Sequence, residues 1–136
     1  MTTDTNPPGT AWMQIVKKNG TSDFAASFTA DARLQTSALS KAVIGPTLIG
    51  AFFAATSKMY EHIEFTAETV DGAKTYLEWD GIHGGKPVAG TTIITRNESG
   101  LIDNIKLFQS PFAVVREFSS GLKEQLEGTL GQDFFS

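Results

Sequence analysis

The stretch that decides the fold is residues 76–111, which read YLEWDGIHGGKPVAGTTIITRNESGLIDNIKLFQSP. Apolar and polar residues alternate along it in three runs, which are separated at Gly84-Gly85 and at Ser99-Gly100. Period-two alternation is typical of strands with one buried face, and glycine readily adopts the positive φ that tight turns need. The stretch therefore predicts three successive antiparallel strands.

Two further strands are expected upstream. Residues 62–69 alternate regularly, and Asp71-Gly72 follows as a strong hairpin signal that joins this run to the next one. A weaker alternation around Leu34 predicts another strand over residues 32–38.

Helices are expected in the first half of the chain and again near its end. Trp12, Ile15 and Val16 share one face of a helix over residues 11–18, because they are spaced i, i+3, i+4. Three other helices are expected. One spans residues 24–28, one starts at Gly45-Pro46 and ends near Lys58, and one follows Pro111.

The order of these elements predicts an α+β domain, in which helices cover one face of a curved antiparallel sheet. We expect a flexible arm over residues 1–10, a single domain over residues 11–127 and a loose tail over residues 128–136.

The composition argues against several classes of function and location. The formal charge is −4 and the only adjacent basic pair is Lys17-Lys18, so nucleic-acid binding is not expected. The apolar tract over residues 43–55 is too short to cross a bilayer, the first residues lack the pattern of a secretory signal, and cysteine is absent. We expect a soluble, cytoplasmic protein without a membrane partner.

Three patches resemble the nuclear transport factor 2-like superfamily, and within it the SnoaL-like and ketosteroid-isomerase-like branches. They are NGTSDFAASFTADARL from Asn19, VIGPTLIGAFFAAT from Val43, and the strand-rich stretch quoted above, which ends in Pro111. The resemblance implies a cystatin-like α+β barrel, in which a cone-shaped, curved antiparallel sheet wraps on three to four helices around an apolar internal cavity. It also implies a homodimer paired through the outer face of the sheet.

The resemblance also directs attention to His83. GIHGG is similar to the Gly-Thr-His-x-Gly segment of the polyketide cyclase branch, although Ile82 stands where threonine is common. Alternation from Leu77 and Trp79 places His83 on the inner face of its strand, at the cavity rim, where a histidine can transfer protons near neutral pH.

Asp103 is the second candidate catalytic residue, because cyclases and isomerases of this superfamily place a carboxylate in this region of the sheet. Its face is ambiguous: Ile105 and Leu107 would put Asp103 inside, whereas Ile102 and Phe108 would put it outside.

Other catalytic groups are not expected. The isomerase-like branch has a carboxylate just after the first strand, but residues 37–40 read SALS. His62 and Glu64 share a polar strand face, and two such ligands do not make a metal site. We therefore expect no metal and no organic cofactor.

The leading hypothesis is a protein that binds a small hydrophobic or aromatic molecule in an apolar pocket. The expected wall residues are Trp12, Leu34, Phe52, Phe53, Tyr60, Trp79 and Phe108. One alternative is an isomerase, cyclase or hydratase-type lyase that uses His83 and Asp103 for proton transfer. Another is a dimeric accessory module with a vestigial cavity.

Overall fold

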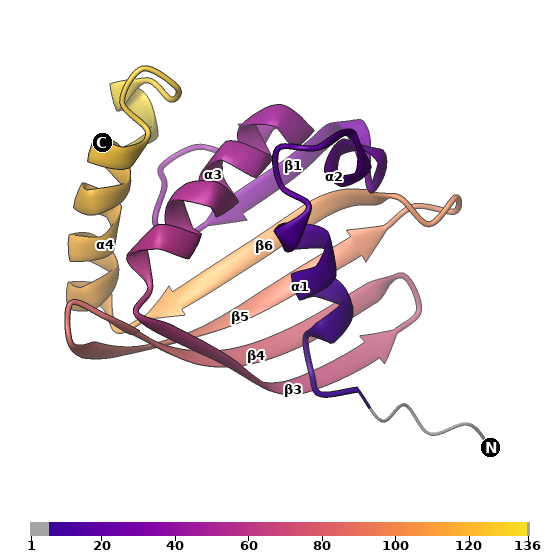
Figure 1. Cartoon of the computed structure of the whole chain (residues 1–136), viewed down its shortest axis with the longest axis horizontal. Coiled ribbons are helices and arrows are strands. Elements are labelled where there is room, and N and C mark those ends of the chain that lie inside the picture. Colours follow the sequence, from indigo (N-terminus) through magenta and orange to yellow (C-terminus); the bar gives the residue numbers. More distant parts are fainter. Residues whose placement is uncertain (1–5, 136) are drawn as a thin grey trace.

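The computed structural model describes residues 6–135, which form an α+β fold built on one six-stranded sheet (Figure 1). Helices α1 and α3 lie across one face of this sheet, and α4 stands beside one end of its strands (Figure 1). The predicted class is confirmed. Residues 1–5 of the predicted arm and Ser136 lie outside the described part of the chain.

The four C-terminal strands form the predicted antiparallel meander. They are β3 (His62–Asp71), β4 (Lys74–His83), β5 (Lys86–Arg96) and β6 (Ile102–Ser110). The strand order across the sheet is β2-β1-β6-β5-β4-β3, so β3 forms one edge.

The other half of the sheet departs from the prediction. Strand β1 (Phe28–Thr36) pairs in parallel with β6, and the short β2 (Val43–Ile44) pairs antiparallel with β1. The sheet is therefore mixed, and the order of its strands leaves it open between β2 and β3 instead of closing into a barrel. Period-two alternation reports a buried face but not the direction of the partner strand, so the sequence could not distinguish these pairings.

The helices are α1 (Thr10–Lys17), α2 (Ser22–Ala26), α3 (Pro46–Met59), α4 (Phe112–Gln125) and a 3₁₀ turn (Gln132–Phe134). Helix α3 begins as predicted, because Gly45 takes a φ of 92° and Pro46 follows in the first turn, where its missing N–H is not needed. Among residues 6–135, no helix combines the length and the apolar character required to cross a membrane.

Helix α2 is shorter at its C-terminal end than predicted. Phe28, which the predicted helix over residues 24–28 included, lies in β1, where it pairs with Ile102. The rings of Phe24 and Phe28 touch, with centroids 4.8 Å apart. Strand pairing therefore takes precedence over the expected helix at this residue.

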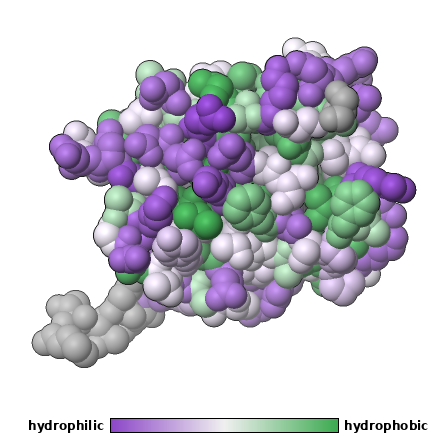
Figure 2. Space-filling model, turned by 180° about the vertical axis from the view of Figure 1, so that it is seen from behind, coloured by the Kyte–Doolittle hydropathy of each residue, from purple (hydrophilic) through white to green (hydrophobic). Residues whose placement is uncertain are grey.

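The core lies between the helices and the inner face of the sheet. Leu34, Ile49, Phe52 and Ile105 are fully shielded from solvent, and Phe118 of α4 joins them. The opposite face of the sheet carries apolar groups scattered among polar ones (Figure 2).

A β-bulge in β3 changes which side chains face the helices. Phe65 pairs with Trp79 and Ala67 pairs with Glu78, so Thr66 is an extra residue without a partner. The alternation therefore reverses after Thr66, and Glu68 shares the face of its partner Leu77. The regular alternation expected over residues 62–69 is therefore interrupted, and Glu68 Oε1 accepts a hydrogen bond from the Gly9 backbone N–H at 2.8 Å.

The C-terminal segment folds back onto the domain, whereas the sequence suggested a loose tail. Phe134 and Phe135 pack against the hydrophobic core, and the Ser40 N–H donates to the Phe134 carbonyl at 2.7 Å. Lys41 forms an ion pair with Asp133. The segment thus covers the loop that follows β1.

Candidate functional site

A partly open cavity of about 70 Å³ lies between helices α1 and α3 and the inner face of the sheet. Its wall is mostly aromatic and aliphatic. The lining residues are Trp12, Met13, Val16, Phe53, Thr56, Ser57, Tyr60, Ile63, Phe65, Trp79, Thr92 and Leu107. Pockets for drug-sized ligands measure roughly 300–1,000 Å³, so this one has room for a molecule of only a few heavy atoms.

Trp79 forms the floor of the cavity on β4. Its ring lies over Gly90, its partner residue on β5, and a Cβ atom at that position would overlap the indole. The indole Nε1–H donates to the Thr92 hydroxyl at 3.1 Å. Two features of β5 therefore hold the indole flat against the sheet: an absent side chain and a hydroxyl acceptor.

Tyr60, which directly follows α3, is held by contacts on several sides. Its ring stacks on Phe118 with centroids 4.6 Å apart and meets Trp79 edge to face at 5.4 Å. Its hydroxyl oxygen accepts a hydrogen bond from Gln109 Nε2 at 2.9 Å. Burial raises the pKa of the Tyr60 phenol to about 12, because the charged form loses its hydration, and the hydrogen bond with Gln109 offsets this only in part.

This pKa predicts a loss of stability at high pH. The unfolded chain releases the Tyr60 proton near the ordinary pKa of 10, whereas the folded chain holds it up to about 12. The contribution is therefore complete below pH 10 and is lost between pH 10 and 12, with a limit of roughly 2–3 kcal/mol. Urea unfolding at intervals from about pH 9 to 11.5 measures this loss.

The control for this measurement is Tyr60→Phe, which keeps the ring but removes the titrating group. All other effects of high pH are common to the two proteins, so the difference between their unfolding free energies cancels them. If the wild type and the variant lose stability in parallel, the Tyr60 phenol does not titrate as expected.

His83 does not line the cavity. Its Nδ1 lies 3.2 Å from the Met59 carbonyl oxygen at the end of α3, and its ring meets Phe118 edge to face at 5.1 Å. A carbonyl only accepts, so Nδ1 carries the proton. Two nearby contacts also tie this hairpin down: Gly85 N–H donates to Glu61, and Lys86 pairs with Glu117. His83 thus joins the β4–β5 hairpin to α3 and α4.

Asp103 lies at the other end of the sheet from His83. On β5, the neighbour of His83 is Lys86, whereas the residues beside Asp103 are Thr95 and Arg96. Nine residues of strand separate these two positions, which corresponds to ~30 Å. The two side chains cannot act on one small substrate.

A second bulge explains the ambiguity over the face of Asp103. Thr95 pairs with Asn104 and Arg96 with Ile102, so Asp103 is the extra residue between them. Ile102 and Ile105 can therefore both be buried despite their odd spacing.

The structure brings together four of the seven predicted wall residues: Trp12, Phe53, Tyr60 and Trp79. Leu34 and Phe52 lie in the fully buried core, away from the cavity wall. Phe108 lies on the outer face, where 48% of it is exposed, because inward alternation on β6 passes through Ile105 and Leu107.

Sequence reasoning missed the polar groups of the wall. Thr92 lies within the Thr- and Ile-rich run of β5, where alternation with the buried Ile94 could have placed it inside. Gln109 and Thr36 gave no such signal, because a polar residue near a strand end usually faces solvent. Thr36 nevertheless donates to Gln109 Oε1 at 3.0 Å, behind Tyr60.

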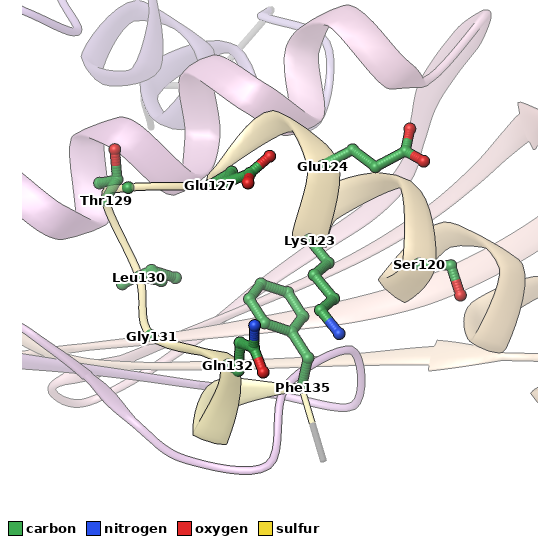
Figure 3. A pocket seen from close by; sticks show the side chains of 10 residues that line it. Ser120, Lys123, Glu124, Glu127, Thr129, Leu130, Gly131, Gln132 and Phe135 are labelled. Atoms are coloured by element: carbon green, nitrogen blue, oxygen red, sulfur yellow. The ribbon is translucent and has the colours of Figure 1, made fainter.

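A larger hollow lies elsewhere on the described surface. It measures about 680 Å³, and its walls come from the end of α4 and from the C-terminal segment (Figure 3). Lys123, Glu124 and Glu127 line it together with polar backbone, so it combines both signs of charge. The cavity of about 70 Å³ between α1, α3 and the sheet is smaller, but it has the largely aromatic and aliphatic wall that is typical of small-molecule sites.

Comparison with known proteins identifies the fold. No family model matches the sequence, and no curated protein matches it. Solved structures do match. A steroid delta-isomerase from Pseudomonas aeruginosa aligns with a TM-score of 0.76 at 15% identity, over 87% of this chain and 88% of that one.

Two further structures show the range of similar proteins. An uncharacterised protein with a cystatin-like fold from Silicibacter pomeroyi DSS-3 has a TM-score of 0.70 at 21% identity, over 85% of this chain and 79% of that one. A candidate polyketide cyclase from Sinorhizobium meliloti has a TM-score of 0.56 at 23% identity, over 71% of this chain and 88% of that one. These likenesses confirm the fold expected from the three sequence patches, a cystatin-like α+β fold.

Proposed function

We propose that this protein binds a small apolar molecule in the cavity between α1, α3 and the sheet. The observation that carries the proposal is the wall itself: aromatic rings from α1, α3, β3 and β4 enclose one small space. A void lined by apolar groups loses dispersion contacts unless something fills it, and a small hydrophobic ligand would restore them.

The geometry favours binding over catalysis. Proton transfer needs an acid or base within hydrogen-bond reach of the substrate. Among the lining residues, the only ionisable side chain is that of Tyr60, which stays neutral at physiological pH. The proposed pair of His83 and Asp103 is split between opposite ends of the sheet.

A fluorescence titration tests the binding proposal. In a Trp12→Phe background, Trp79 is the remaining tryptophan and lies in the cavity wall. Saturable changes in its emission on addition of small hydrophobic molecules are the expected result. Val16→Phe, which adds a ring to the wall, should weaken binding at least tenfold because the ligand and the new ring compete for one space.

The matched control is Gln14→Phe, which adds the same ring to the exposed side of α1. If no small hydrophobic molecule changes the Trp79 emission, or if both phenylalanine variants weaken binding equally, the cavity is not the binding site.

We also propose that the chain forms a homodimer through the outer face of the sheet. Phe108 is exposed there beside Thr91, and Ile82 is exposed nearer the β4–β5 turn, beside Pro87. Light scattering at micromolar concentration should give the mass of two chains, and Phe108→Glu should give one, because a buried charge opposes association. The control is Val70→Glu, at the far end of β3; a monomeric wild type would contradict the proposal.

A further inference from the structure

The atoms that face one another behind Tyr60 give the directions of the hydrogen bonds there. The Ala38 backbone N–H, which can only donate, lies 3.2 Å from Thr36 Oγ1. Thr36 Oγ1 therefore accepts there. Gln109 Oε1 lies 3.0 Å from the same Thr36 oxygen and, as an amide oxygen, can only accept, so the Thr36 proton is directed to it. With Oε1 facing Thr36, the Gln109 amide must present its NH₂ group to Tyr60, at 2.9 Å.

These hydrogen bonds leave Tyr60, a residue of the cavity wall, with an unused donor. Its oxygen already accepts from Gln109, so the phenolic proton is left for another acceptor. The Thr92 hydroxyl also has an unused proton, because its oxygen accepts from the Trp79 indole N–H, which can only donate. The hydrogen bonds of the described residues provide an acceptor for neither proton, and both residues line the cavity.

The remaining two lining hydroxyls differ from these. Thr56 and Ser57 both donate to the Phe53 carbonyl, at 3.1 and 2.7 Å, so their protons are already used within α3. The free donors of the wall are thus gathered around the Tyr60–Trp79 contact, next to the sheet.

The wall also selects against charge. None of the twelve lining residues carries a charge at neutral pH, so an ionic ligand would lose its hydration without gaining a counter-charge. Cation–π attraction from the aromatic rings is the one effect that would oppose this, and it amounts to about 2 kcal/mol at a desolvated site.

Given that the cavity binds a ligand as proposed above, we propose that this ligand is a small neutral molecule with a carbonyl-type oxygen. The oxygen accepts hydrogen bonds from the Tyr60 and Thr92 hydroxyls. Gln109 and Thr36 act as positioning residues, which hold the Tyr60 proton toward the ligand without touching it.

Three probes of similar size test the ligand class: cyclopentanone, cyclopentane and tetramethylammonium. Binding is followed by the NMR shift of the Trp79 indole N–H, at equal concentrations below the solubility limit of cyclopentane. The measured quantity is the ratio of the cyclopentanone affinity to the cyclopentane affinity, because this ratio isolates the contribution of the oxygen.

Two variants should lower this ratio by about threefold to tenfold, the size of one neutral hydrogen bond. Tyr60→Phe removes the donor. Gln109→Glu keeps the donor but offers it a carboxylate, so the Tyr60 proton turns away from the cavity, and a purely structural role of Gln109 would weaken both probes equally. Gln35→Glu adds the same charge on the exposed face of β1 and should leave the ratio unchanged.

The outcomes separate the two proposals. If both hydrocarbon and ketone bind but the ratio is the same in wild type, Tyr60→Phe and Gln109→Glu, the carbonyl inference is overturned and the binding function stands. Tighter binding of tetramethylammonium than of cyclopentanone would also overturn it, in favour of a cation. Failure of all three probes to shift the indole signal counts against the binding function itself.

Discussion

Phe52→Ala is expected to lower the free energy of unfolding by about 3–5 kcal/mol, and the melting temperature by roughly 10–20 °C. The Phe52 side chain has no exposed surface, and its ring meets Phe53 edge to face at 5.2 Å. Its removal from α3 leaves a void beneath the cavity that rigid neighbours cannot fill. Thermal and urea unfolding, followed by circular dichroism, measure the effect.

The control for this experiment is Phe112→Ala in α4, a position that is 74% exposed. The same deletion there should change the free energy of unfolding by no more than about 0.5 kcal/mol. Equal losses in the two variants would show that Phe52 is not part of a tightly packed core.

Gly90→Ala should destabilise the protein by about 1–3 kcal/mol and disturb the cavity floor. The new methyl group would overlap the Trp79 ring, which is itself held by the hydrogen bond to Thr92. The ring would have to leave its position, so both the near-ultraviolet circular dichroism and the Trp79 emission should change. Unfolding curves recorded on the same samples give the free energy.

Gly121→Ala makes the same chemical change with the opposite expectation. The new methyl group would meet only the terminal carbon of Met59, which can rotate away, and alanine favours a helix by up to about 1 kcal/mol over glycine. The variant should therefore be as stable as the wild type or more so. A Gly90→Ala protein with unchanged stability would mean that Trp79 does not lie flat over β5.

The sequence predicted those parts of the fold that depend on local chemistry. Gly45-Pro46 marks the start of α3, and the turns at Gly72 and Gly84 have the positive φ that the hairpins need. Alternation from Leu77 through Trp79 also placed the inner face of β4 correctly. These signals act within a few residues, so a single sequence is enough to read them.

The errors arise from interactions between distant segments. Bulges at Thr66 and Asp103 reverse the alternation. The local sequence does not mark the first one, and at the second it shows only the conflict between Ile102 and Ile105. Phe108 was placed in the cavity for the same reason. The polar groups behind Tyr60 come from β1 and β6, whose parallel pairing was not anticipated. Their role depends on the register between two strands that are far apart in sequence.

The position of β1 inside the sheet also has a consequence for synthesis. Leu34 pairs with Ile105, and about 70 residues of chain lie between them. At 5–20 residues per second, a ribosome needs roughly 4–14 s to add them. During that time β1 has only the two-residue β2 as a partner, so we expect the β3–β6 meander to form first and to receive β1 afterwards. Protease digestion of stalled nascent chains would detect this order, and early protection of β1 would exclude it.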